Sequence, residues 1–339
     1  MGFTYAKAGV NVWKIKGIQG GIASLLESTL NENVILPAGH YAGVIKIGNK
    51  HIAMHTDGVG TKVLIAQLLE KFDTVGIDAV AMNVNDIVCI GARPVALMDY
   101  LAIETTDEKQ IYEIMKGIAI GAKMVNCPVV GGETAVVPDL IKGFTGRGFD
   151  LSISVVGEVD GELITGEKMK TDDVIIGIES SGLHSNGYSL ARKVLLNDRN
   201  LLNEELLLEM LVPTYIYSNA VLDVLKKVKS VRGMAHITGG AFSKLMRIGR
   251  LANKGFLLDN MPEPLPIFNL IQKEGKIEDR EMYRTFNMGI GFCIVCDNRD
   301  MKKVIEICKK HKFKAQKIGK ITSKEEVILQ KNGKKTDLA

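Results

Sequence analysis

The first part of the chain alternates hydrophobic and polar positions in the way that β-strands require. Residues 43–55 contain two short apolar runs around Gly48 and Asn49, a pair that tolerates the positive φ of a tight hairpin turn. Residues 95–103 and 149–155 form an apolar run and a cleanly alternating run, each of strand length. Together these patterns predict a β-sheet in the N-terminal half.

Longer runs between these strands repeat at helical spacing. Residues 74–90 place apolar side chains on one face and stop at Gly91. A second helical run, 111–125, follows the strand at 95–103 and leads into another strand that begins at Pro128. Strand, helix and strand at this spacing predict a βαβ unit.

A polar, glycine-containing stretch at 158–173 is the best candidate for a domain boundary. After it, residues 174–178 form a buried strand and residues 287–296 form another. Both halves mix strands with helices. The fold class predicted is therefore α/β (α+β), with domains at 1–165 and 166–339.

The charge pattern excludes some partners. The net charge is +4, but residues 299–335 carry 13 Lys or Arg and 4 Asp or Glu, a net of +9. Phe313 is the only aromatic residue among them, and platforms that stack on single-stranded nucleic acid need more. This segment is predicted to be a solvated face, and no nucleic-acid partner is expected.

Five cysteines at irregular spacing do not resemble a disulfide framework, and we expect reduced thiols. Cys293 and Cys296 fall on a predicted strand, where positions three apart point to opposite faces, so core packing is favoured over a zinc site. No apolar run approaches the roughly 20 residues of a membrane span. With no signal-peptide pattern at the start, a cytoplasmic protein is predicted.

The segment 56–62 carries the strongest chemical signal. Gly58 and Gly60 let the backbone approach an anion closely, and successive N–H groups can form a phosphate nest. Lys62 adds positive charge, and Asp57 is a hard oxygen ligand suited to Mg²⁺. The competing interpretation is a tight turn with a surface lysine, and the residues alone leave the two balanced.

Polar residues also interrupt the helix at 74–90. Asn83 and Asp86 are three positions apart and share a face. A carboxylate on an apolar helix needs a partner. That partner is either a metal ion or a hydrogen-bonding group from a neighbouring element.

Three further glycine-rich segments occur at predicted element ends: 131–134, 180–187 and 236–240. The strand end at 131–134 is a usual ligand position in α/β sheets. The loop at 180–187 presents hydroxyls, an imidazole and an amide before a helix N-terminus, which favours anion binding. His184 and His236 on two such loops raise the odds of a functional role above those of a lone histidine.

Taken together, these segments resemble aminoimidazole ribonucleotide synthetase, also called phosphoribosylformylglycinamidine cyclo-ligase. The matching segments follow one another along nearly the whole chain: 56–62, 84–86, 130–134, 181–189, 213–217, 236–240 and 282–291. The resemblance implies ATP-driven closure of formylglycinamidine ribonucleotide to aminoimidazole ribonucleotide in purine biosynthesis. It also implies a homodimer in which the N-terminal domains pair into a barrel-like core, and unpaired strand edges in that half agree with such pairing.

The resemblance also assigns roles to residues. Asp57 and Asp86 would hold Mg²⁺, with Asp73 as a further candidate. The ATP site would use Gly58, Gly60, Thr61, Lys62, Glu133 and Thr134. The nucleotide substrate would meet Ser181, His184, Asn186 and Thr238, and Lys62, His184 and His236 are the candidate catalytic residues.

Two alternatives remain. One is another ATP-dependent enzyme of the same superfamily. Selenophosphate synthetase would need a cysteine or selenocysteine in its N-terminal glycine loop, but the chain has none before Cys89. Thiamine-monophosphate kinase, a small-molecule kinase, would not be expected to carry the stretch at 181–187. The other is a nonenzymatic nucleotide-binding subunit, and the retained carboxylates and lysine argue against it.

Overall fold

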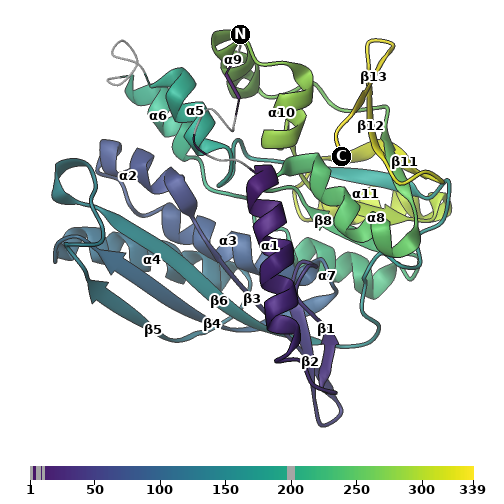
Figure 1. Cartoon of the computed structure of the whole chain (residues 1–339), viewed down its shortest axis with the longest axis horizontal. Coiled ribbons are helices and arrows are strands. Elements are labelled where there is room, and N and C mark those ends of the chain that lie inside the picture. The colour runs from purple at the N-terminus through teal and green to yellow at the C-terminus, as the bar shows by residue number, and fades with distance from the viewer. Residues whose placement is uncertain (1–2, 5–8, 10–11, 197–202) are drawn as a thin grey trace.

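The computed structural model describes residues 3–4, 9, 12–196 and 203–339. The chain folds into two mixed α/β halves, each built on its own sheet (Figure 1). The fold class predicted from the sequence is therefore confirmed. None of the helices in the described ranges has the length and apolar character to cross a membrane.

In the described part of the chain, the first sheet has six strands in the order β1-β2-β3-β6-β4-β5. Its strands are β1 (Val34–Leu36), β2 (Gly43–Ile47), β3 (Lys50–Gly58), β4 (Ala92–Ile103), β5 (Val129–Val136) and β6 (Phe149–Val159). The helical segments of this half are α1 (Val12–Glu27), η1 (Gly60–Lys62), α2 (Val63–Leu69), α3 (Val75–Val88), α4 (Glu108–Met124) and η2 (Phe144–Gly146).

Two predicted motifs of this half are confirmed. Strands β2 and β3 form an antiparallel hairpin, and Gly48 in its turn has a φ of +59°. Strands β4 and β5 pair in parallel, with α4 as the connection between them, which is the βαβ unit. One face of the sheet packs on α3, while Met54, Met98 and Tyr100 are exposed.

Helix α3 lies between the two halves. It packs on β3, β4 and β6 of the first sheet, on α4, and on α7 and β8 of the second half. All of its residues are buried except Ile77. A helix that is buried all round must satisfy its polar side chains through neighbouring elements.

In the same described ranges, the second sheet has seven strands in the order β13-β12-β9-β11-β7-β10-β8. Its strands are β7 (Val174–Glu179), β8 (Gly233–His236), β9 (Gly255–Leu258), β10 (Ile290–Cys296), β11 (Ala315–Thr322), β12 (Val327–Lys331) and β13 (Lys334–Asp337). The helical segments are α5 (Tyr188–Leu195), α6 (Glu204–Leu211), α7 (Ser218–Lys227), η3 (Ala241–Leu245), α8 (Met246–Ala252), α9 (Pro266–Gly275), α10 (Asp279–Thr285), η4 (Asn298–Asp300) and α11 (Met301–Lys310).

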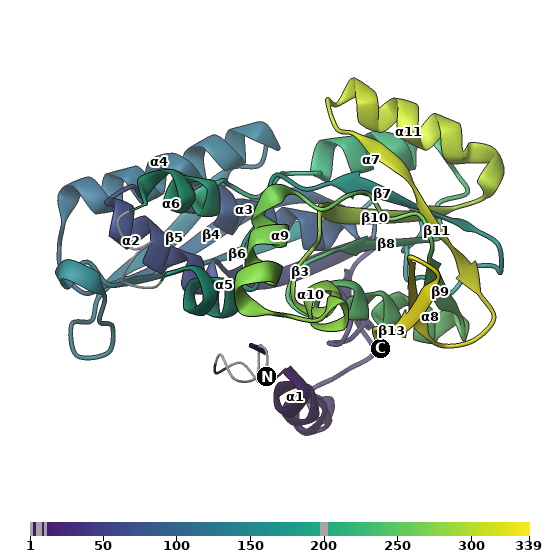
Figure 2. The ribbon, with the colours of Figure 1, turned by 90° about the horizontal axis from the view of Figure 1, so that it is seen from above.

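Helices cover both faces of this second sheet. Figure 2 shows α7 and α11 on one side of it and α8 and α10 on the other. Every residue of β10 is buried as a result. Cys293 and Cys296 lie within this strand, and all five cysteines are buried free thiols, so the core-packing interpretation of this pair agrees with the structure.

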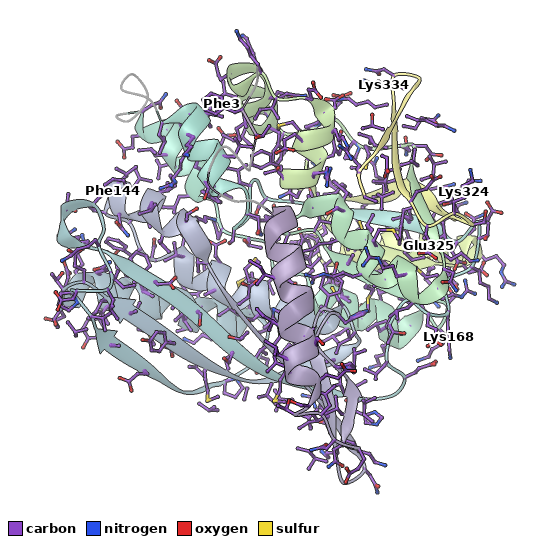
Figure 3. The ribbon with its side chains drawn as sticks, in the orientation of Figure 1. Phe3, Phe144, Lys168, Lys324, Glu325 and Lys334 are labelled. Atoms are coloured by element: carbon purple, nitrogen blue, oxygen red, sulfur yellow. The ribbon has the colours of Figure 1, made fainter. Side chains whose placement is uncertain are left out.

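The basic segment 299–335 forms α11, the central strand β11, and β12 with the start of β13 at one edge of the second sheet. Val304, Ile307 and Cys308 of α11 face the core. Lys324 and Lys334 project outward from the periphery (Figure 3) and are exposed. The positive charge of this segment is therefore carried on a solvated surface.

Candidate active site

Two carboxylates meet where the first sheet adjoins α3. Asp57 lies near the end of β3, and Asp86 is buried near the C-terminal end of α3. The side-chain amide of Asn83 donates to the carbonyl oxygen of Asp57 at 3.1 Å, which ties the strand to the helix. Burial and the negative charge of Asp86 together raise the pKa of Asp57. The site thus holds two carboxylates, and the charge of Asp86 disfavours the ionisation of Asp57.

His236 reaches Asp86 from the second half. It ends β8, and its Nδ1 lies 2.7 Å from Oδ1 of Asp86. Its Nε2 faces the amide nitrogen of Asn85 at 3.4 Å, and the backbone N–H of Tyr217 donating to Asn85 Oδ1 fixes that amide's orientation. Because the amide can only donate, Nε2 accepts, and Nδ1 carries the proton that is donated to Asp86.

Asp86 is held in its ionised form. Burial acts to raise the pKa of Asp86, but the hydrogen bond from His236 and the charge of Lys244 outweigh it, so the pKa is lowered. His55 adds to this effect, with Nε2 at 3.5 Å from Asp86 Oδ2. The partner of Asp86 in this structure is therefore an imidazole from another element, which was one of the two possibilities that the sequence left open.

Lys244 is a site residue that the sequence did not reveal. It belongs to η3, its side chain is half-buried, and its ammonium donates to the Thr238 hydroxyl. Burial lowers the pKa of Lys244, while the charges of Asp86 and Asp57 act to raise it. The only available signal was its position six residues after Thr238 in the glycine-rich loop.

The glycine segment after Asp57 turns sharply into η1. Gly60 has a φ of +66°, a conformation that favours glycine. The N–H of Gly58 donates to the Asp57 carboxylate at 2.8 Å, and Thr61 Oγ1 lies 3.3 Å from Ser189 Oγ. Gly58 thus lies beside the Asp57 carboxylate, and Thr61 faces the second half.

Lys62 occupies a different position from the one predicted. Its side chain is completely buried, and Nζ lies 2.8 Å from Asp78 Oδ2 and 2.6 Å from the carbonyl oxygen of Val212. Both contacts are with protein groups inside the junction of the halves. The ammonium predicted to contact phosphate is therefore already paired.

The loop at 181–187 contributes a strained, buried histidine. His184 has a φ of +62°, which is unfavourable for a residue with a side chain. Its Nε2 accepts the backbone N–H of Ser181 at 3.2 Å, so the ring proton is on Nδ1. No described residue forms a hydrogen bond with Nδ1. Burial, followed by positive charge nearby such as that of Lys62, lowers the pKa of His184 well below its usual value.

The loop also meets the first half. The rings of His184 and His236 are 6.5 Å apart, so His184 lies near the carboxylate pair. Gly291 makes this arrangement possible, because a Cβ at that position would overlap Tyr217 and His184. Asn186 contacts Met82 of α3 at 4.0 Å, whereas the Ser181 hydroxyl donates to the Pro213 carbonyl at 2.6 Å.

Three predicted residues are not brought to this place. Glu133 and Thr134 lie on β5, three strand positions from β3 and so roughly 14 Å away at about 4.8 Å per strand. Asp73 lies beyond the other end of α3 from Asp86, about 20 Å at 1.5 Å per residue, and pairs with Lys71 at 2.9 Å. In the described ranges, no group of three or more His, Cys, Asp or Glu side chains is arranged to hold a metal ion.

Comparison with known proteins places these features in a family. The AIR synthase related protein family matches over its N-terminal domain at residues 39–159 and over its C-terminal domain at 170–332. Phosphoribosylformylglycinamidine cyclo-ligase of Methanocaldococcus jannaschii is 46% identical over 96% of this chain and 93% of its own length. The enzyme of that name from Saccharolobus solfataricus is 47% identical over 88% of each chain.

A solved structure shares the fold at lower identity. Hydrogenase maturation protein HypE in complex with ATP superposes with a TM-score of 0.65 at 17% identity, covering 92% of this chain and 88% of HypE. The two domain matches together span most of the chain, and the curated relatives match it over nearly its full length. This chain therefore belongs to the AIR synthase related protein family.

Proposed function

We propose that this protein is a phosphoribosylformylglycinamidine cyclo-ligase, which converts formylglycinamidine ribonucleotide and ATP into aminoimidazole ribonucleotide, ADP and phosphate. One observation carries the proposal: the loop bearing His184 adjoins the carboxylate pair at the junction of the two halves. Its near full-length relatives with this name support it. The reaction needs a site for ATP and a site for a second nucleotide side by side, and in this proposal both lie at the junction.

The chemistry suits these residues. The formyl amide oxygen becomes a leaving group once the γ-phosphoryl group of ATP is transferred to it. The amidine nitrogen then forms the new C–N bond, the C–O bond to phosphate breaks, and the nitrogen loses a proton. Such a reaction depends on positioning and charge stabilisation more than on a nucleophilic side chain.

The carboxylate pair fits Mg²⁺. Mg²⁺ is usually bound by one or two carboxylates together with substrate phosphates. Burial and, after it, the charge of Asp86 raise the pKa of Asp57, and a bound cation would offset both effects. Asp57 and Asp86 would hold the ion, which when bound supplies positive charge to the phosphates of ATP. His236 keeps Asp86 ionised and oriented through its Nδ1 hydrogen bond.

In this proposal ATP binds mainly to the first half and the nucleotide substrate to the second half. Gly58, Gly60 and Thr61 bind the phosphates of ATP, and Lys244 adds positive charge beside the carboxylates. ATP in the solved HypE complex supports ATP as the co-substrate. The roles of Glu133 and Thr134 in ATP binding stay predictions.

The second substrate would meet the loop at 181–187. The Nδ1–H of His184 has no hydrogen-bond acceptor among the described residues, and a substrate oxygen that reaches this buried position would supply one. Because its pKa is lowered, His184 binds as a neutral imidazole. Asn186, Ser181 and Thr238 stay the further candidates for substrate binding.

The direct test is ATP turnover by the purified protein with and without formylglycinamidine ribonucleotide. We expect ADP and aminoimidazole ribonucleotide to form in equal amounts, and no ADP without the nucleotide. A kinase of the same superfamily would instead leave a phosphorylated product, and a binding subunit would produce no ADP. Either of these results would overturn the proposal.

We also propose a homodimer built on the first sheet. Its outer face exposes the apolar residues Met54, Val95, Met98 and Tyr100, and the edge strand β5 is exposed along most of its length. Glu133 pairs in register with Tyr100, so it belongs to the same face. Exposed apolar faces and unpaired edges of this kind are covered in stable assemblies, and a barrel-like core between two such sheets would cover both.

Sedimentation equilibrium at micromolar concentration tests the dimer. The wild type should sediment as a dimer, and Met98→Glu should shift it to a monomer. Leu251→Glu, at an exposed apolar position in the second half, is the matched control and should leave the dimer intact. A monomeric wild type would contradict the proposal.

We retain domains at 1–165 and 166–339 as part of this proposal, since the connection from β6 to β7 runs through 160–173 between the two sheets. A cytoplasmic location is proposed as well. The five free thiols support it, because disulfides are rare in that compartment.

A further inference from the structure

A second polar cluster joins the two halves at the other end of α3. Asp78 lies in the first turn of that helix and pairs with Lys62 across 2.8 Å. From the second half, Thr214 donates both its backbone N–H, at 2.7 Å, and its hydroxyl, at 2.6 Å, to Asp78 Oδ1. Ser185 donates its hydroxyl to the same oxygen at 3.1 Å. One carboxylate thus gathers groups from three segments that are far apart in the sequence.

The cluster is complete without a ligand. The side chains of Lys62 and Asp78 are both fully buried. The ammonium contacts Asp78, the Val212 carbonyl oxygen and, at 5.8 Å, the ring of Tyr188. In a buried ion pair with additional hydrogen bonds on both partners, these contacts offset the cost of removing the two charges from water. We expect such a pair to specify one arrangement of the elements that it joins.

The elements joined here carry the candidate substrate loop. Ser185 sits one residue after His184, and the Tyr188 hydroxyl donates to the His184 carbonyl at 3.1 Å. The Ser181 hydroxyl ties the start of the loop to Pro213, next to Thr214. His184 and Pro213 are each next in sequence to a residue that donates to Asp78, namely Ser185 and Thr214. Through these two residues, the ion pair holds His184 in place relative to segment 56–62.

The same helix holds the neighbouring segment at a second point. Asn85, two turns after Asp78, donates to the Tyr215 carbonyl at 2.8 Å and accepts the N–H of Tyr217 at 2.8 Å. Segment 212–217 is therefore attached to α3 at two points. This arrangement resists sliding of the second half along the helix.

We propose that the Lys62–Asp78 pair is a positioning device that sets the 181–189 loop for the nucleotide substrate, and that Lys62 does not bind the phosphates of ATP. The identity of that substrate rests on the proposed function, whereas the attachment of the loop does not. In this proposal Lys62 neutralises Asp78, and Asp78 holds Ser185 and Thr214. Removing the ammonium therefore shifts the loop that carries His184.

The test compares Lys62→Met with Lys62→Arg, and uses Lys227→Met as the matched control. Lys227 also forms a lysine–aspartate pair, at 2.7 Å to Asp223, but on the exposed surface of α7. Three quantities are measured for each variant: the dissociation constant of AMPPCP with Mg²⁺, the KM values of both substrates, and amide hydrogen exchange by segment. Exchange and AMPPCP binding need no turnover.

For Lys62→Met we expect the KM of formylglycinamidine ribonucleotide to rise by about tenfold or more, while AMPPCP affinity changes by less than about twofold. Exchange should accelerate at 181–189 and 212–217 by about tenfold or more, with the strands of the first sheet unchanged. Lys62→Arg keeps the charge and should restore part of the KM effect. Mere loss of folded protein would lower kcat and leave both KM values unchanged.

If Lys62→Met fails to fold, Thr214→Val takes its place, because it removes one of the three hydrogen bonds to Asp78 and leaves the ion pair intact. The same pattern is then expected at about threefold. A loss of AMPPCP affinity of about tenfold with normal exchange in the loop would overturn the proposal, as would unchanged exchange and unchanged KM. If the wild type does not turn over formylglycinamidine ribonucleotide, the proposed function fails, while exchange and AMPPCP binding still decide the role of Lys62.

Discussion

Helix α3 carries two polar clusters that differ in whether the protein itself balances the negative charge of the carboxylates. Near its start, Asp78 is matched by an ammonium and by three protein hydrogen-bond donors, so its charge is balanced within the protein. Near its end, Asp86 faces another carboxylate, Asp57, and the pKa of Asp57 is raised by burial and by that neighbour. A balanced buried cluster is typical of structural roles, whereas an unbalanced pair is typical of a ligand site. Residue type alone does not separate the two cases, because both contain aspartate and lysine.

The largest expected effect is the loss of turnover on changing Asp86 to Asn. Removing this charge weakens both the proposed capture of Mg²⁺ and the hydrogen bond from His236, and turnover should fall by about a hundredfold or more. Steady-state ADP release measures it, with circular dichroism as the check on folding. Asp139→Asn, an exposed carboxylate of the first half, should retain full turnover. Near-normal turnover of folded Asp86→Asn at limiting Mg²⁺ would remove the metal assignment.

An intermediate effect is expected at Lys244. Its ammonium lies beside the carboxylate pair and is half-buried, so it is placed to meet phosphate in a way that Lys62 is not. Lys244→Met should weaken AMPPCP binding by about tenfold, as for the loss of one charge-assisted contact. Isothermal titration measures this, and Lys229→Met on the surface should bind normally. If Lys244→Met binds AMPPCP as tightly as the wild type, Lys244 does not contact the phosphates of the nucleotide, and neither polar cluster supplies a lysine to them.

The last comparison concerns stability, where a small effect is expected at Asp57 and an effect of the opposite sign at Asp78. The pKa of Asp57 is raised in the folded state, which means that the folded protein favours the protonated carboxyl. This contribution to stability is lost as the pH rises through the raised pKa. At neutral pH the ionised carboxylate therefore disfavours folding. Asp57→Asn should therefore raise the Tm without Mg²⁺ by roughly 1–3 °C at pH 7, with the difference disappearing near pH 3.

The same change at Asp78 should act in the opposite direction. Breaking a buried pair by removing one partner costs about 3–5 kcal/mol, so Asp78→Asn should lower the Tm markedly. Differential scanning calorimetry of both variants in parallel gives the comparison. Equal shifts of the same sign would show that the two clusters do not differ as described.

Much of the fold could be predicted from the sequence because local periodicity determines it. The β2–β3 hairpin, helix α3 and strand β10 each have an apolar repeat that matches one element type. Helix α1 was missed, since Gly17, Gly20 and Gly21 disrupt a helical pattern. Strands β12 and β13 were missed because their lysine-rich sequence resembles a solvated tail, although Val327 and Leu329 are buried.

The site was predictable in its residues more than in their pairing. Asp57, Asp86 and His236 come together in the structure, although from the sequence His236 was a candidate catalytic residue and not the partner of Asp86. The partner of Lys62 was not predictable, because Val212 lies 150 residues away and the motif around Lys62 is the same whether its ammonium faces phosphate or Asp78. Lys244 carries no motif of its own and gains its place only when η3 folds beside the strands.

Labelling of the buried cysteines by a thiol reagent can report when parts of the protein unfold. Burial raises the pKa of Cys127 to about 11 and the pKa values of Cys296 and Cys308 to about 12, so reactive thiolate is scarce while the chain is folded. Cys127 lies in the first half and the other two in the second. The rates at which a thiol reagent labels them therefore distinguish a chain that opens as one unit from one whose halves open separately, without any introduced probe.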